Sequence, residues 1–231
     1  MSTAIRERLS KVLESIEEAA EKRGITPEKI TLVAVSKKQS LDLMKRYESV
    51  CEEMGRKAIF GENYVQEFAA KRPYLSPSSR CHLIGTLQSN KVKKAIGLFD
   101  LIESVHSVNL LKMIDKEACK AGKTQDIYLQ INISRDPGKS GFLEEEVRDA
   151  WKIGLGLSGV KLKGIMAITR YYEKREDVRK DFARMREILD NLSGDQTLDL
   201  SMGMSRDYDI AIEEGATVVR IGTAIFGPRR Q

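Results

Sequence analysis

The chain has 231 residues, of which 41% are hydrophobic and 32% are charged, and its formal net charge is +5. This balance is typical of a soluble globular protein. No run reaches the roughly 18 apolar residues of a membrane span, and the charged N-terminus has no signal-peptide core. The three cysteines, Cys51, Cys81 and Cys119, have no metal-binding or redox spacing. We therefore expect a cytoplasmic protein with reduced thiols, no membrane association and no metal site.

The basic residues point to no nucleic-acid partner. Most Lys and Arg alternate with Glu and Asp, which is typical of solvated helix faces. One local basic group, residues 90–94, is a candidate nucleic-acid contact, but it has no interleaved aromatic residues and belongs to no known motif. We expect no nucleic-acid binding. Steeply salt-dependent binding would be the sign that this group does contact nucleic acid.

Short apolar runs alternate with amphipathic segments along the whole chain. A helix is predicted first, over residues 3–23, by apolar residues at steps of three and four, and Gly24 is a typical terminator. Eight strands are then predicted at residues 30–35, 58–60, 82–84, 101–105, 127–133, 160–168, 198–202 and 218–226. Between them, helices are predicted near residues 40–55, 63–71, 88–97, 108–121, 143–157, 176–192 and 206–214.

This alternation favours a parallel sheet, and eight strands in this length favour a closed barrel. We predict an α/β fold: one (β/α)8 TIM-type barrel with an extra N-terminal helix, forming a single domain over residues 1–231. The alternative is an open doubly wound sheet. It is less favoured because no GxGxxG motif opens any of the predicted helices.

A barrel places its chemistry at the carboxyl ends of its strands. The first strand is followed there by Lys37, which is a candidate for a Schiff base with a carbonyl ligand. Lys38 competes with it, because only one of two neighbouring side chains points into the barrel mouth. The second strand is followed by Asn63, which is a candidate ligand or a helix N-cap.

The C-terminal segment predicts a phosphate site. Gly222 comes two residues after Arg220 in the last apolar run and is followed by Thr223, and a glycine beside a hydroxyl residue there is typical of a loop whose free backbone N–H groups hold a phosphate. Ser201 and Ser205 lie at the end of the preceding strand, and Ser205 is equally a candidate N-cap for the helix near 206–214. Arg220 lies inside an apolar strand, and a buried guanidinium needs an acceptor.

Six blocks occur in an order that resembles a known family. They are VAVSK (33–37), FGENYVQE (60–67), HLIGTLQSNK (82–91), GIMAI (164–168), LSMGMS (200–205) and VRIGTAIFG (219–227). Together they resemble the pyridoxal phosphate homeostasis proteins, of the YggS/PROSC type, from about residue 5 to the C-terminus. The resemblance implies a barrel related to the N-terminal domain of alanine racemase, with pyridoxal 5′-phosphate as its cofactor.

The resemblance also implies roles for single residues. Lys37, rather than Lys38, becomes the Schiff-base lysine, and Asn63 lies beside the cofactor ring. Arg220 faces the pyridine nitrogen, while Gly222 and Thr223 hold the phosphate. Ser205 is preferred to Ser201 as a phosphate ligand because of its spacing from the arginine. The sequence departs from many relatives at Thr86, at Arg206 and in a longer segment over residues 45–57.

The resemblance implies a cofactor carrier in vitamin B6 homeostasis rather than an enzyme, with no catalytic residues. An arginine at the pyridine nitrogen leaves that nitrogen unprotonated, so the ring is a poor electron sink. We also expect no second domain to supply the tyrosine base of the racemases. The alternative is a weak pyridoxal phosphate-dependent amino acid racemase. The expected partners are the cofactor and apo-forms of pyridoxal phosphate enzymes, and the expected state is a monomer.

Overall fold

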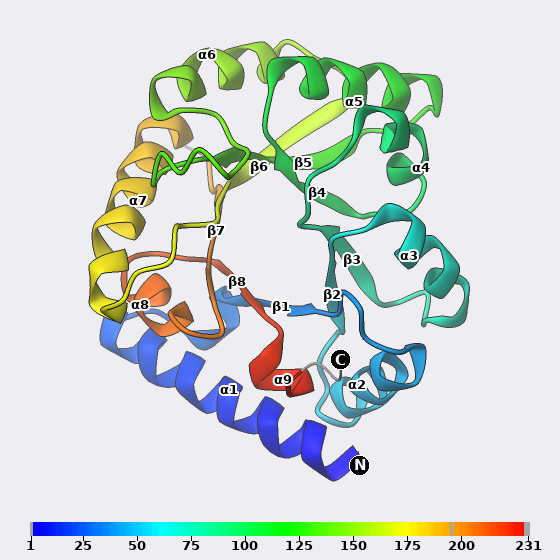
Figure 1. The fold of residues 1–231 in the computed structure, drawn as a ribbon, viewed down its shortest axis with the longest axis vertical. Coiled ribbons are helices and arrows are strands. Elements are labelled where there is room, and N and C mark those ends of the chain that lie inside the picture. Colours follow the sequence, from blue (N-terminus) through cyan, green and yellow to red (C-terminus); the bar gives the residue numbers. More distant parts are fainter. Residues whose placement is uncertain (1, 195, 229–231) are drawn as a thin grey trace.

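A computed structural model describes residues 2–194 and 196–228 of the chain. Eight parallel strands form a closed barrel in chain order, and each pairs with the next until β8 pairs with β1 (Figure 1). The strands are β1 (Thr31–Val35), β2 (Ile59–Glu62), β3 (Arg80–Leu83), β4 (Leu101–Val105), β5 (Gln125–Ile131), β6 (Val160–Ala167), β7 (Asp199–Met204) and β8 (Val218–Ile221). The predicted TIM-type barrel is confirmed.

Helices surround the barrel, and the predicted extra helix precedes it. They are α1 (Ser2–Arg23), α2 (Leu41–Glu53), α3 (Val65–Lys71), α4 (Val92–Ile96), α5 (Val108–Lys120), α6 (Glu144–Leu155), α7 (Arg179–Ser193), α8 (Tyr208–Glu213) and α9 (Thr223–Phe226). Four single 3-10 turns lie at Pro27–Lys29, Arg72–Tyr74, Ser89–Lys91 and Arg175–Val178. Helix α1 packs across α2, α8 and α9 (Figure 1). No helix in the described part of the chain is both long and apolar enough to cross a membrane.

The prediction for the last strand was wrong at its end. Residues 218–226 were predicted as one strand, but β8 ends at Ile221 and the residues from Thr223 to Phe226 form α9. The amides of Ile225 and Phe226 both donate to the carbonyl of Gly222, which turns the chain into a helix. An apolar run of this length does not distinguish a strand from a short helix.

The barrel interior has an apolar layer at one level and a polar layer above it. The apolar layer is a cluster of Val33, Leu101, Tyr128, Met166 and Val218. The larger hydrophobic core lies outside the barrel, between strands and helices. Because side chains alternate along a strand, the interior residues two positions further along β4 and β8 are Glu103 and Arg220. Charged groups therefore enter the barrel interior from its own strands.

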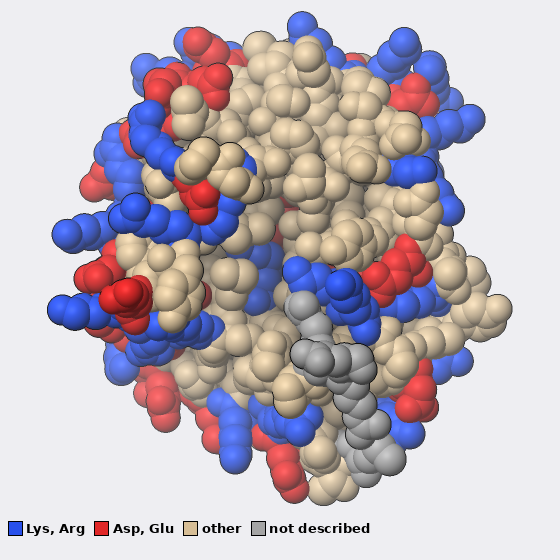
Figure 2. Space-filling view, viewed as in Figure 1, with Lys and Arg blue, Asp and Glu red and all other residues tan. Residues whose placement is uncertain are grey.

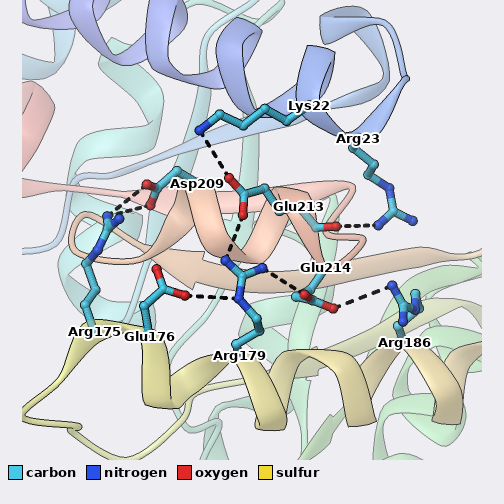
Figure 3. A network of polar contacts seen from close by, with 9 residues as sticks. All are labelled: Lys22, Arg23, Arg175, Glu176, Arg179, Arg186, Asp209, Glu213 and Glu214. Carbon is cyan, nitrogen blue, oxygen red and sulfur yellow. Dashed lines mark hydrogen bonds and ion pairs between the residues drawn. The ribbon is translucent and has the colours of Figure 1, made fainter.

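Ion pairs hold α7 and α8 together beside the barrel (Figure 3). Arg179 of α7 donates to Glu213, the last residue of α8, and to Glu214, which directly follows it, at 2.8 Å each. Arg175 donates to Asp209 at 2.9 and 2.8 Å, near the N-terminus of α8. These contacts fix the helix that directly follows β7, and so they fix the loop that contains Ser205.

Candidate functional site

Lys37 lies at the C-terminal end of β1, just beyond its last residue. Its side chain is half-buried, whereas that of Lys38 is exposed. Lys37 has the same strand parity as Val33, which belongs to the interior cluster. The backbone turns at Lys38, with a φ of 60°, and the Lys38 amide donates to Glu67 Oε1 at 2.8 Å. The structure therefore brings Lys37 to the barrel mouth and leaves Lys38 on the outer surface.

Glu62, the last residue of β2, is a fully buried carboxyl group close to this lysine. Ser36 donates to its Oε1 at 2.6 Å, and its Oε2 has no hydrogen-bond partner among the described residues. Burial raises the pKa of Glu62 to about 7, while the Ser36 hydrogen bond and the charges of Lys71 and Lys37 act to lower it. Glu62 is therefore a group that titrates near neutral pH.

Glu62 should make the stability of the protein depend on pH. Its pKa is raised in the folded state, so stability should fall as the pH rises from 4.5 to about 7 and then level off. We expect Glu62→Gln to abolish this fall in the free energy of unfolding, which amounts to roughly 3 kcal/mol. Urea unfolding at several pH values measures it, with the exposed Glu52→Gln as control. An equal pH slope in the parent protein and in Glu62→Gln contradicts the prediction.

Asn63 is not a helix N-cap, because α3 begins at Val65 and its N-cap residue is Tyr64. Its Oδ1 is buried and has no partner among the described residues. The backbone of Asn63 is packed against Gly85, where an added Cβ would lie 2.6 Å from the Asn63 Cα. A buried acceptor without a partner is costly unless a ligand satisfies it. Asn63 therefore fits a ligand that has a hydrogen-bond donor.

Arg220 is buried inside the barrel, with only 3% of its surface exposed. It donates to Ser201 Oγ at 2.5 Å and to the carbonyl oxygen of Ala167 at 2.7 Å. Burial lowers the pKa of Arg220, while the charge of Glu103 acts to raise it. A guanidinium has five N–H groups, so donors remain for a ligand after these two hydrogen bonds. The protein itself therefore supplies two of the hydrogen-bond acceptors that the buried Arg220 needs.

Sequence reasoning missed Glu103, which is the counter-charge of Arg220. Its Oε2 accepts from Ser201 Oγ at 2.6 Å and lies 3.8 Å from Arg220 NH1, and its Oε1 is 2.7 Å from His82 Nδ1. Burial pushes the pKa of Glu103 up, but His82, Arg220 and Ser201 together hold it below its usual range. A glutamate inside an apolar strand was the signal that could have revealed it.

Ser205 lies against the first turn of α9. Its Oγ is 3.3 Å from the Gly222 amide and 3.5 Å from the Ala224 amide, and both amides donate to it. The reading of Ser205 as the N-cap of the next helix was wrong, because α8 begins after Asp207, whose carboxylate accepts from the Met204 amide. The neighbouring Thr223 is exposed. Ser205, Gly222 and Thr223 therefore lie together where β7 and β8 end.

Ser201 lies deeper than the other candidate residues. It is fully buried, and its hydroxyl joins Arg220 to Glu103 rather than facing the α9 turn. As a direct phosphate ligand it stays an untested prediction. The preferred serine, Ser205, is the one that lies near Gly222.

A cavity of about 340 Å3 lies beyond the C-terminal ends of β6 and β7, next to the candidate residues but not lined by any of them. Its wall includes Met204 and Arg206, and the Arg206 guanidinium lies 4.4 Å from the centre of the Tyr171 ring. The surface of the barrel face is hollowed at its centre, with basic side chains in and around the hollow (Figure 2). The described residues contain no group of three or more His, Cys, Asp or Glu side chains that could hold a metal ion. The site is thus suited to an anionic organic ligand.

These features define a barrel of the alanine racemase type, and residues 13–230 match the family of the alanine racemase N-terminal domain. The chain belongs to the family of pyridoxal phosphate homeostasis proteins. It is 40% identical to the protein of that name from Aquifex aeolicus, over 97% of this chain and 98% of the relative. It is 36% identical to the Pseudomonas aeruginosa protein of the same name, over 99% of this chain and 97% of the relative.

Solved structures agree with this assignment. PipY of Synechococcus elongatus, solved with pyridoxal phosphate bound, is 33% identical, with a TM-score of 0.82 over 96% of this chain and 100% of PipY. An alanine racemase from Clostridium difficile is 16% identical, with a TM-score of 0.70 over 99% of this chain and 58% of the racemase. The racemase likeness concerns the fold alone.

Proposed function

We propose that the protein binds pyridoxal 5′-phosphate, holds it as a Schiff base on Lys37 and serves vitamin B6 homeostasis without efficient substrate turnover. The observation that carries the proposal is the convergence of a half-buried lysine, a buried arginine and the Ser205–Gly222–Thr223 group at one end of the barrel. The related PipY has been solved with the cofactor bound, and the curated relatives carry the homeostasis name.

The residues present fit this cofactor on their own chemistry. The unpartnered Oδ1 of Asn63 is an acceptor for the ring hydroxyl, and the hydroxyls and amides near Gly222 are donors for the phosphate. Lys37 supplies the amine, and Arg220 supplies N–H groups for the pyridine nitrogen. When bound, the cofactor provides an aldehyde and a ring that withdraws electrons strongly only if its nitrogen is protonated.

Arg220 is a reason to expect little electron withdrawal by the bound cofactor. A guanidinium is a permanent donor, so a pyridine nitrogen that accepts from it carries no proton. Glu103 stabilises the charged form of Arg220, which keeps this donor in place. Electron withdrawal by the ring is then weak, and substrate carbanions are poorly stabilised.

A weak amino acid racemase is the second candidate, and Glu62 is the observation that favours it. Its pKa of about 7 is suited to a general acid or base. However, Glu62 has the strand parity of Phe60, which packs in the core between barrel and helices, and its carboxyl group binds Ser36 there. We therefore place the carrier function first.

The absorbance spectrum of the purified protein mixed with pyridoxal 5′-phosphate tests the proposal. We expect a Schiff-base band that borohydride removes, and one covalently attached cofactor by mass spectrometry. Amino acids should not be turned over at ordinary enzyme rates, of order 1–1000 per second. Turnover at such rates would establish the racemase instead. A folded protein that takes up no cofactor would contradict both functions.

We further propose a cytoplasmic monomer that passes the cofactor to apo-forms of pyridoxal phosphate enzymes. The transfer role is supported by the homeostasis name of the relatives. Light scattering measures the oligomeric state. Mixing the loaded protein with an apo-enzyme, across a range of apo-enzyme concentrations, separates direct transfer from release into solution, because only direct transfer makes the rate rise with that concentration.

Replacing Thr223 tests the phosphate site. A hydrogen bond to a charged group contributes about 1.5–3 kcal/mol, so Thr223→Val should weaken cofactor binding about tenfold or more, while Thr223→Ser should bind normally. Pyridoxal without its phosphate should bind far more weakly than the cofactor. Absorbance titration gives these affinities. An unchanged affinity in Thr223→Val would limit Thr223 to backbone contacts, and equal binding of pyridoxal and its phosphate would refute the site.

A further inference from the structure

A continuous chain of polar side chains crosses the barrel interior below Lys37. It runs from Arg220 of β8 through Ser201 of β7 and Glu103 of β4 to His82 of β3. The four residues are at most 6% exposed. His82 also lines a cavity of about 280 Å3, together with residues from the N-terminal ends of the strands. The chain therefore extends from the expected cofactor ring toward the opposite end of the barrel.

The direction of each hydrogen bond in this chain is set by its chemistry. Arg220 has no acceptor, so NH1 donates to Ser201 Oγ. The Ser201 hydroxyl then donates its own proton to Glu103 Oε2. The other oxygen of Glu103, Oε1, lies 2.7 Å from His82 Nδ1, so a proton on Nδ1 is donated to the carboxylate. Both oxygens of Glu103 are thus held, and only an ionised carboxylate accepts from both sides.

This arrangement fixes the plane of the Arg220 guanidinium. NH1 is tied to Ser201, and through it to Glu103, while NH2 is tied to the carbonyl oxygen of Ala167. Two ties on different nitrogen atoms prevent rotation of the planar group. The directions of the remaining N–H groups are then fixed as well.

We propose that Glu103 and His82 are positioning residues that aim the Arg220 guanidinium at the pyridine nitrogen. This inference rests on the proposed function and deepens it, because it names the groups that fix the ring contact. Glu103 acts through the bridging Ser201 hydroxyl and through its charge, 3.8 Å from NH1. His82 acts one step further away by holding Glu103. The pair therefore governs recognition of the ring nitrogen and leaves the phosphate contacts unchanged.

The test compares two probes, pyridoxal 5′-phosphate and its 1-deaza analogue, in which C–H replaces the ring nitrogen. The parent protein should prefer the natural cofactor about tenfold, as expected for a hydrogen bond to a charged donor. In Glu103→Gln this preference should fall to about twofold or less, and in His82→Gln it should fall partway. For each protein the affinity for pyridoxal 5′-phosphate is divided by the affinity for the 1-deaza analogue. Comparing this ratio between parent and variant cancels the different aldehyde reactivities of the two probes.

Ser104 provides the matched control. It neighbours Glu103 on β4, it is equally buried, and its hydroxyl has no partner among the described residues. Because side chains alternate, it has the opposite strand parity to Glu103. Ser104→Ala should keep the full preference for the ring nitrogen. Binding of inorganic phosphate, measured by competition, should be the same in all of these proteins.

An unchanged preference in both Glu103→Gln and His82→Gln overturns the inference. If Glu103→Gln does not fold, His82→Gln decides alone, because it leaves the carboxylate in place. A parent protein that binds both probes equally also overturns the inference, since no ring-nitrogen contact then exists. A folded parent protein that binds neither probe contradicts the proposed function itself, and this inference with it.

Discussion

Replacing Lys37 with alanine should reduce the borohydride-trapped cofactor adduct to background. Lys37 is the half-buried lysine at the end of β1, and it has the strand parity of the barrel interior. A covalent bond to the cofactor requires this amine, whereas the proposed phosphate contacts of Ser205 and Thr223 do not depend on it. We therefore expect Lys37→Ala to retain weak, reversible binding. Mass spectrometry of peptides after reduction identifies the modified residue.

Lys38→Ala is the matched control for this experiment. Lys38 is exposed, and its contact with Glu67 uses the backbone amide, which the substitution retains. Its φ of 60° is unfavourable for any residue with a side chain, so alanine loses little relative to lysine there. Lys38→Ala should form the adduct fully. A single-site adduct that persists in Lys37→Ala would move the assignment, most simply to Lys38.

The strands were predictable because each is a short apolar run followed by a turn or helix signal. The exact ends were not. After Gly222 the residues Thr-Ala-Ile-Phe are as apolar as a strand, and only the hydrogen bonds to the Gly222 carbonyl make them a helix. Ser205 and Asp207 are both good N-cap residues, and local sequence does not choose between them. In the structure the Ser205 hydroxyl accepts from amides at the start of α9, and Asp207 takes the N-cap position of α8 without a side-chain capping bond.

Within the site, the residues at strand ends were predictable and the interior network was not. Lys37, Asn63 and Arg220 are found where a barrel places its strand ends, and the structure brings them to one end. Glu103 lies in the run LIESV, whose five residues are all buried. Its partners are 21 and 98 residues away, at His82 and Ser201. A contact of that separation leaves no local pattern, so only the unexplained charge in a strand indicated it.

Removing the Arg220 charge should destabilise the barrel strongly. Breaking one partner of a buried ion pair costs about 3–5 kcal/mol, because the other charge stays buried without compensation. We expect a loss of that size for Arg220→Met, measured as the free energy of unfolding in urea. Arg220→Glu should lose more, since two carboxylates would then lie close together in the interior.

The double variant Arg220→Met/Glu103→Gln separates this explanation from a simple packing defect. Neutralising both partners leaves no uncompensated charge, so the double variant should recover a large part of the stability that Arg220→Met loses. If the double variant loses as much stability as the two single variants together, the two residues do not interact.

Measuring the free energy of unfolding at several pH values gives the same test without a second substitution. In the parent protein the pKa of Glu103 is held below its usual range, so its contribution to stability is present above the unfolded pKa and is lost as the pH falls. In Arg220→Met the Glu103 pKa should be higher than in the parent protein, because the charge of Arg220 is lost while His82 and Ser201 still act to lower it. The stability difference between parent and variant should therefore be largest near neutral pH and should shrink as acid protonates Glu103 in both. A difference that is constant across that range would mean that the Glu103 charge plays no part in holding Arg220.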